Sequence, residues 1–145
     1  MKMKSKRTTR VLAFGTFDIL HPGHIAYLTY AKQQGETLAV IIARDSSVRK
    51  IKGSLPLFTE RDRLRMVRTL RMVDIAFLGD RKDHYRSIEK TQPDIICLGY
   101  DHRISEDALL EELKKRNIRI SKIVRAKKYH AGEYKSSIFK QKIKH

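Results

Sequence analysis

The sequence predicts an α/β protein in which a parallel five-stranded sheet carries helices on both faces. Short apolar runs alternate along the chain with segments of helical periodicity, and no internal repeat or low-complexity linker interrupts them. The 145 residues are enough for one domain with a real core. Right-handed crossovers place the strand-to-helix loops at one edge of such a sheet, where ligands bind.

Apolar runs mark the strands. The first begins just after a basic start and ends at Gly15, and the fourth is closed by Gly99. The last run has an imperfect alternation of apolar and polar residues, whereas the second, LAVIIA, is continuously apolar and therefore typical of a buried strand. The five expected strands are residues 11–14, 38–43, 74–78, 94–98 and 118–124.

Helices are expected between these strands. Pro22 suits the first turn of the first helix, which Gly35 ends. Thr59 and Ser105 are suitable N-caps for two later helices. Residues 44–58 are polar and basic and predict a loop. The expected helices are residues 22–34, 59–70, 85–90 and 105–116, with a last basic helix over residues 136–143.

The charge balance is strongly basic. The chain has 32 Lys and Arg against 16 Asp and Glu, a net charge of +16. Such a surplus attracts polyanions, either nucleotide phosphates or nucleic acid, although a solvated basic surface explains most of it equally well. The basic residues are spread over the whole chain and lack the interleaved aromatics of an RNA-binding motif. We therefore do not expect a nucleic acid partner.

Location and domain limits follow from the apolar runs and the cysteine count. No run is long enough to span a membrane, and the basic start lacks the apolar region of a signal peptide. Cys97 is the single cysteine and cannot form an internal disulfide. We expect a cytoplasmic protein without a membrane partner. Residues 1–9 are predicted to be a basic flexible tail, and residues 10–145 a single domain.

The most informative segment is residues 15–24, GTFDILHPGH, between the first strand and the first helix. A helix N-terminus offers unpaired N–H groups and a partial positive charge, which together bind phosphate. Gly15 and Gly23 let the backbone approach a ligand closely. His21 and His24 share one face of the helix and can donate hydrogen bonds to phosphate oxygens. They need not act as bases, because phosphoryl transfer is catalysed mainly by positioning and charge compensation.

The histidine pair has two other possible interpretations. The pair could ligate zinc, but zinc usually takes three or four ligands, and Cys97, His84, His102 and His130 show no ligand spacing. The histidines could also merely cap the helix. The complete ten-residue string at a strand-to-helix junction favours phosphate binding, and we expect no structural metal.

The first four and last four residues of this string resemble the signature of the cytidylyltransferase-like nucleotidyltransferases. That superfamily includes glycerol-3-phosphate cytidylyltransferase, pantetheine-phosphate adenylyltransferase and the archaeal FAD synthases. The resemblance implies a Rossmann-like three-layer domain and direct in-line attack on the α-phosphorus, with no covalent enzyme intermediate. It also implies that His21 and His24 bind the triphosphate and stabilise the transition state. Backbone groups of Thr16 and Phe17 would line the phosphate site.

Further positions match the family pattern. Lys52 corresponds to a lysine that reaches the phosphates or the acceptor, the alternative being an ordinary loop lysine. Arg61 and Arg63 open a helix where the family often places a phosphate-contacting arginine, the alternative being a solvated helix face. Asp18 is a candidate helper for metal or acceptor, or only a helix cap.

Two later segments also resemble nucleotide-binding parts of the family. Gly99 and Asp101 resemble the loop after the fourth strand, although a plain turn is the alternative. Ser136 and Ser137, with Lys140, resemble the start of the last helix, which closes over the triphosphate; a simple helix cap is the alternative.

Softer similarities point to the archaeal FAD synthases and extend over roughly residues 10–143. The sequence departs from that branch at Tyr100 and His102, where small or amide residues are expected, and it lacks a cysteine before Ser136. The matching positions are residues 43–45, 50–56, 60, 66–67, 98–99, 101 and 111–116.

This resemblance implies the adenylylation of FMN by ATP with Mg²⁺ or another divalent metal. The FMN phosphate is the nucleophile and is already ionised near neutral pH, because its second pKa is about 6, so no general base is required. Mg²⁺ would bridge phosphates. No tightly held organic cofactor beyond the flavin itself is expected. Family members are commonly dimers, so a homodimer is expected.

Two alternatives stay open at this point. The first is a cytidylyltransferase that uses CTP with glycerol 3-phosphate or another alcohol phosphate. The second is a non-catalytic nucleic-acid-binding protein on the same fold, suggested by the net charge of +16.

Overall fold

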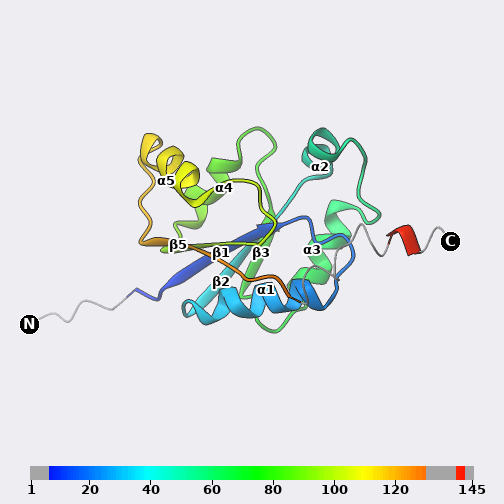
Figure 1. Cartoon of the computed structure of the whole chain (residues 1–145), viewed down its shortest axis with the longest axis horizontal. Coiled ribbons are helices and arrows are strands. Elements are labelled where there is room, and N and C mark those ends of the chain that lie inside the picture. Colours follow the sequence, from blue (N-terminus) through cyan, green and yellow to red (C-terminus); the bar gives the residue numbers. More distant parts are fainter. Residues whose placement is uncertain (1–6, 130–139, 143–145) are drawn as a thin grey trace, which may run out of the picture.

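A computed structural model describes residues 7–129 and 140–142 of the chain (Figure 1). Its centre is a five-stranded sheet with the order β3-β2-β1-β4-β5, and every neighbouring pair is parallel. The prediction of a parallel five-stranded sheet is therefore confirmed. The strands are β1 Arg10–Gly15, β2 Thr37–Ile42, β3 Ile75–Leu78, β4 Ile95–Leu98 and β5 Lys122–Arg125.

Helices cover both faces of this sheet, as predicted (Figure 1). On one face, Leu28 and Val67 pack in the same core cluster as β1 and β2, and on the other face Ile88 and Leu109 do so. The first pair belongs to α1 and α3, and the second pair to α4 and α5. The helices are α1 Pro22–Gln33, α2 Asp45–Lys52, α3 Glu60–Arg68, α4 His84–Thr91 and α5 Glu106–Lys115.

The two core clusters explain why the central strands are continuously apolar. Along β1, Val11 and Ala13 join the α1/α3 side, and Leu12 between them joins the α4/α5 side. Because successive side chains of a strand point to opposite faces, a strand covered on both sides needs an apolar residue at every position. The same alternation holds in β2, where Val40 and Ile41 face opposite layers.

The prediction of a loop over residues 44–58 is wrong in its first half, because the structure forms α2 there. Only Val48 of this helix is buried, so the segment has no apolar stripe for a sequence pattern to detect. Asp45 lies in its first turn and basic residues lie in its last turn, which suits the helix dipole. Gly53 ends α2 in the left-handed conformation, with φ 81°.

The predicted helix caps agree with the structure, whereas the start of the last strand differs. Both predicted caps are confirmed: Thr59 Oγ1 accepts from the Asp62 N–H at 3.2 Å, and Ser105 Oγ accepts from the Ala108 N–H at 3.1 Å. The last strand begins at Lys122, later than expected, because the chain first turns after Asn117 at φ 59°. Of the predicted helix 136–143, residues 140–142 are described and are helical, and the rest lies outside the described residues.

Part of the expected N-terminal tail can be placed. Residues 1–6 lie outside the described residues. The carbonyl oxygen of Thr9 accepts from the N–H groups of Glu36 and Thr37, at 2.9 and 3.2 Å, and Arg7 lies 3.8 Å from a carboxylate oxygen of Asp94. Among the described residues, no helix is both long and apolar enough to cross a bilayer.

Strand order fixes where a ligand site is expected. The chain runs outward from β1 through β2 to β3 and then returns to place β4 on the other side of β1. A crevice forms where the strand order reverses, at the carboxyl ends of the neighbouring strands. The loops after β1 and β4 flank this crevice, and these are the loops that carry Gly15 to His24 and Gly99 to Asp101.

Candidate active site

The segment from Gly15 to His24, called here the histidine loop, joins the carboxyl end of β1 to the first turn of α1. His21 is the N-cap residue of α1, and its Nδ1 accepts a hydrogen bond from the Gly23 N–H at 3.1 Å. Pro22 follows in the first turn, where its missing N–H costs nothing. The structure therefore places both predicted histidines at a helix N-terminus beside the crevice.

The two imidazoles lie against each other. Their ring centroids are 3.8 Å apart and the ring planes differ by 26°. His21 is 9 % exposed and His24 is half-buried. Since Nδ1 of His21 accepts a hydrogen bond, the proton of the neutral ring is assigned to Nε2, which makes Nε2–H the donor of this ring.

Both rings are kept neutral near pH 7. Burial lowers the pKa of His24 to about 4, helped by the nearby charges of His21 and Lys52 and opposed by the carboxylate of Asp101. Burial also lowers the pKa of His21, again opposed by Asp101. Neutral imidazoles donate hydrogen bonds without the full repulsion of two adjacent cations, so the pair can stay in contact without a bound ligand.

Phe17 turns the histidine loop and supports the histidine pair. Its backbone is left-handed, with φ 55°, which is uncommon for a residue with a bulky side chain. The Phe17 ring is 2 % exposed and packs edge-on against His24, with centroids 5.2 Å apart. A Cβ at Gly15 would lie 3.0 Å from this ring. The glycine is thus needed for the approach of a phenylalanine ring, and not only for that of a ligand.

The loop after β4 approaches the histidine loop from across the crevice. The Gly99 N–H donates to His102 Nδ1 at 3.0 Å, and the His102 ring stacks on Phe14 of β1 with centroids 5.1 Å apart. Asp101 is exposed and lies close enough to influence the pKa of both His21 and His24. Asp101 thus lies within electrostatic reach of the histidine pair, and Gly99 lies in the same loop.

Lys52 lies at the end of α2 and is exposed. Its charge contributes to the low pKa of His24, which places the ammonium group within electrostatic reach of the histidine pair. Arg61 is exposed on the first turn of α3, whereas Ser136 and Ser137 lie outside the described residues.

Asp18 joins three parts of the chain. It is 3 % exposed, and its two carboxylate oxygens accept from the N–H groups of Leu57 and Phe58 at 2.8 and 2.9 Å. Lys140 also forms an ion pair with it. Burial alone would raise the pKa of Asp18, but the bonds from Lys140, Phe58 and Leu57 bring it below its ordinary value. This ionised carboxylate holds the segment before α3 and the side chain of Lys140 against the histidine loop.

Arg63 lies under the histidine loop and is completely buried. Its guanidinium donates to the carbonyl oxygens of Thr16 and Phe58, at 2.8 and 3.1 Å, and to Asp45 Oδ1 at 2.7 Å. The alternative of a solvated helix face is therefore wrong for this residue. Three well-placed acceptors match the fixed fork of a guanidinium, so Arg63 ties the histidine loop to α2 and α3.

A second arginine extends this network. Arg44 donates to the Gly79 carbonyl oxygen at 2.7 Å and pairs with Glu60 at 2.9 Å, and Glu60 accepts from the Asp45 N–H at 3.0 Å. The positioning roles of Arg44, Asp45 and Glu60 were missed in the sequence. A basic residue just after a strand and an acidic residue at the start of a later helix are the sequence signal for the Arg44–Glu60 pair.

Oxygen ligands for a divalent metal are sparse in the described part of the chain. No group of three or more His, Cys, Asp or Glu side chains there could hold a metal ion. Mg²⁺ commonly uses one or two carboxylates together with substrate phosphates and waters. Asp101 fits that requirement because it is exposed and close to the histidine pair, whereas the oxygens of Asp18 already accept backbone hydrogen bonds.

Known proteins have sequences similar to that of this chain. The cytidylyltransferase-like family model matches residues 12–142. An FAD synthase of Aciduliprofundum boonei is 48 % identical over 120 residues, which are 83 % of this chain and 79 % of that protein. An FAD synthase of Thermoplasma acidophilum is 43 % identical over 134 residues, which are 92 % of this chain and 93 % of that protein.

A solved structure agrees over nearly the same length. The crystal structure of a protein from Thermoplasma volcanium, described as a lipopolysaccharide core biosynthesis protein, is 44 % identical, with a TM-score of 0.81 over 85 % of this chain and 99 % of that one. From the histidine loop, the parallel sheet and these matches, the chain belongs to the cytidylyltransferase-like family of nucleotidyltransferases, and its curated relatives named above are FAD synthases.

Proposed function

We propose that this chain is an FMN adenylyltransferase, which transfers AMP from ATP to the phosphate of FMN and forms FAD and pyrophosphate. The observation that carries this proposal is the contact between two neutral imidazoles at the N-terminus of α1, with ring centroids 3.8 Å apart, in a chain whose relatives are FAD synthases. That arrangement suits a triphosphate. The relatives favour ATP and FMN over the alternative of CTP with an alcohol phosphate.

The reaction needs positioning more than proton transfer. An oxygen of the FMN phosphate attacks the α-phosphorus of ATP, an O–P bond forms, and the bond between the α-phosphorus and the bridging oxygen breaks, so that pyrophosphate leaves. The nucleophile is already ionised, because the second pKa of a phosphate monoester is about 6. No residue has to remove a proton, and the protein has to hold two anions together.

The histidine loop supplies the donors for this task. We assign the Nε2–H of His21 and an N–H of His24 to triphosphate oxygens, together with the backbone around Gly15, Thr16 and Gly23. These groups offset the charge that grows on the oxygens in the transition state. The ring of His21 is oriented before substrate arrives, since its Nδ1 already accepts from the Gly23 N–H.

Cations on neighbouring elements complete the proposed site. Lys52 is assigned to the phosphates or to the acceptor, because it acts on the His24 pKa from the end of α2. Arg61 remains a candidate contact to the acceptor. Lys140, with Ser136 and Ser137, is assigned to the triphosphate, and its ion pair with Asp18 supports this placement for the lysine. Gly99 and Asp101 are assigned to the nucleotide.

Asp18 and Arg63 are assigned a positioning role instead of a ligand contact. The Asp18 oxygens accept from two amides, and the Arg63 guanidinium donates to three acceptors. For Mg²⁺, we propose that Asp101 would supply the protein carboxylate. When bound, the metal offsets phosphate charge.

We also propose that the chain forms a homodimer and is cytoplasmic. Sedimentation analysis tests the first of these.

A substrate panel tests the assigned reaction. The purified chain is incubated with Mg²⁺ and each combination of ATP or CTP with FMN, riboflavin or glycerol 3-phosphate, and products are separated by chromatography. FAD and pyrophosphate in equal amounts from ATP and FMN, with nothing from riboflavin, is the expected result. Exclusive use of CTP with glycerol 3-phosphate would reject the flavin assignment. No nucleotide transfer in any combination would reject the reaction itself.

A further inference from the structure

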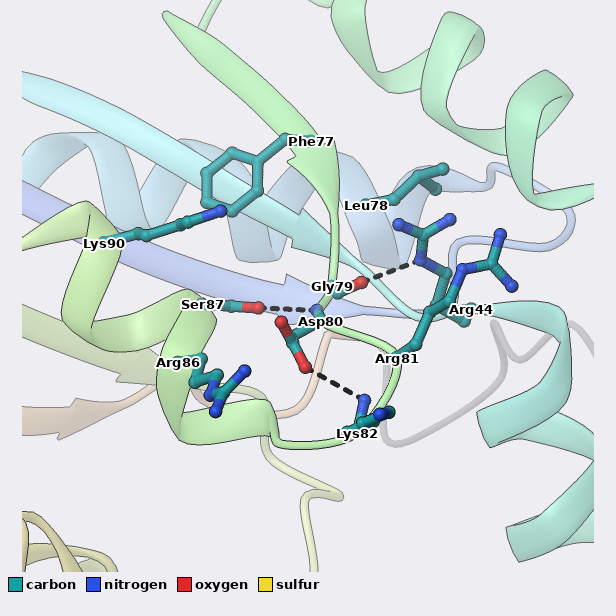
Figure 2. A pocket seen from close by; sticks show the side chains of 10 residues that line it. All are labelled: Arg44, Phe77, Leu78, Gly79, Asp80, Arg81, Lys82, Arg86, Ser87 and Lys90. Carbon is teal, nitrogen blue, oxygen red and sulfur yellow. Dashed lines mark hydrogen bonds between the residues drawn. The ribbon is translucent and has the colours of Figure 1, made fainter.

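A pocket that is separate from the histidine loop opens at the carboxyl end of β3. It has a volume of about 410 Å³ and lies between the end of β3, the start of α4 and Arg44 (Figure 2). In register, Gly15 of β1 is level with Ile42 of β2, and Ile42 with Leu78 of β3. Adjacent strands are about 4.8 Å apart, so the pocket floor is roughly 10 Å across the sheet from the end of β1.

Charge is the main feature of this pocket. Its lining includes five cationic side chains, Arg44, Arg81, Lys82, Arg86 and Lys90, and a single carboxylate, Asp80. In Figure 2, Arg44 and Arg81 lie on one side of the hollow, and Arg86 and Lys90, one helical turn apart on α4, lie on the other. Glu60 offsets the charge of Arg44, but the other four cations around the hollow repel one another, and a bound anion relieves this repulsion.

One carboxylate offsets only part of this surplus, and Asp80 also accepts hydrogen bonds within its own turn. Asp80 Oδ1 accepts from the N–H groups of Lys82 and Asp83, both at 2.9 Å. The Asp80 N–H donates to the buried hydroxyl of Ser87 at 2.7 Å. These hydrogen bonds hold the turn that carries Arg81 and Lys82, so this side of the pocket has a defined backbone.

One cation is fixed and the others have room to adjust. Arg44 is held by Gly79 and Glu60, so it keeps its position before a ligand binds. Arg81, Lys82, Arg86 and Lys90 are exposed, and Arg86 and Lys90 act on the pKa of Asp80. The cations surround a hollow instead of forming a stripe, which suits a small anion better than a nucleic acid strand.

We propose that the pocket at the end of β3 binds a phosphate-type oxyanion, at a place distinct from the histidine loop. The group that the pocket recognises is a phosphoryl or pyrophosphoryl group held by Arg44, Arg86 and Lys90. This group can belong to a free ion such as pyrophosphate or to a phosphorylated metabolite. The proposal rests on the pocket alone and not on the proposed reaction.

An NMR titration that resolves single residues tests the proposed anion site. The ¹⁵N-labelled chain is titrated with pyrophosphate, inorganic phosphate, FMN and riboflavin, each against sodium chloride at matched ionic strength. Backbone amides of Arg81 and Ser87 report on the pocket, and those of Gly15 and Gly23 report on the histidine loop. We expect saturable shifts at the pocket amides with at least one phosphate-bearing probe. Shifts with pyrophosphate or inorganic phosphate would identify the ligand as a free ion. Shifts with FMN but not with the other probes, riboflavin included, would identify it as the phosphate of a metabolite.

Variants then locate the binding. The double variant Arg86→Gln/Lys90→Gln should weaken the pocket response at least about tenfold, because two charge-assisted contacts are lost. The matched control, Lys114→Gln/Lys115→Gln, removes two cations from the end of α5 and should change nothing at the pocket. Equal affinity in both double variants, or no pocket shift beyond that of chloride, would overturn the proposal. The Gly15 and Gly23 shifts and the FAD assay report separately on the proposed reaction.

Discussion

Arg63 donates a hydrogen bond to the carbonyl oxygen of Thr16 at 2.8 Å, from a position with no solvent exposure. This bond ties the first residues of the histidine loop to a helix that is distant in the sequence. The next residue, Phe17, has a positive φ of 55°, so the loop is held in a conformation that it would not keep alone. The geometry of the histidine pair therefore depends on an arginine that need not touch a substrate.

The first prediction concerns this arginine. Replacing Arg63 with Met should destabilise the fold by at least about 3 kcal/mol, because it leaves the buried partners of a guanidinium unsatisfied. Arg63→Lys should retain more stability but lose turnover, because one ammonium group cannot reach three acceptors. Urea unfolding and steady-state kinetics measure both effects. Arg61→Met, on the exposed side of the same turn, is the stability control, and a similar loss there would contradict the assigned role.

The second prediction concerns the pH dependence of stability. The pKa of His24 is about 4 in the folded chain, mainly because of burial, against an unfolded value of about 6.5. The unfolded chain therefore binds more protons between these values, and stability falls as pH decreases from about 6.5 towards 4. Unfolding free energies at several pH values for the wild type and for His24→Asn should differ in slope within this window. A His24 ring that titrates near 6.5 by NMR would contradict the expected burial.

The third prediction concerns catalysis by His24. Replacing it with Ala should reduce kcat by on the order of a hundredfold or more, the usual effect of removing one donor to a developing anion. The fold should persist, because His24 belongs to neither of the two hydrophobic core clusters. The control is His84→Ala at the exposed start of α4. Turnover within a factor of two of the wild type would remove His24 from the proposed mechanism.

The fourth prediction concerns Lys52. Its charge contributes to the low pKa of His24, so Lys52→Met should raise that pKa, and NMR titration of the ring measures the change. The same variant should raise KM for a phosphorylated substrate or lower kcat, because a cation near the phosphates is lost. Lys50→Met, in the same helix, serves as the comparison. If the two variants behave alike in both measurements, Lys52 has no special place in the site.

Several parts of the site could be predicted because their signal is local. The histidine loop combines a strand end, two glycines and a helix start within ten consecutive residues, and the structure forms each of these. The caps at Thr59 and Ser105 are local in the same way, since the side chain bonds an amide three residues later. By contrast, α2 was not predicted. It buries only Val48, so its sequence has no apolar periodicity that would indicate a helix.

By itself, the sequence determined the alternation of strands and helices, the parallel sheet and the position of the histidine pair at the start of α1. These features depend on periodicity and on contacts between near neighbours. Only the tertiary structure decided that Arg63 is buried under Thr16, that Asp18 bonds Leu57, Phe58 and Lys140, and that five cations surround one pocket at β3. Such contacts join residues that are far apart in the chain, and the fold alone brings them within hydrogen-bonding or electrostatic reach.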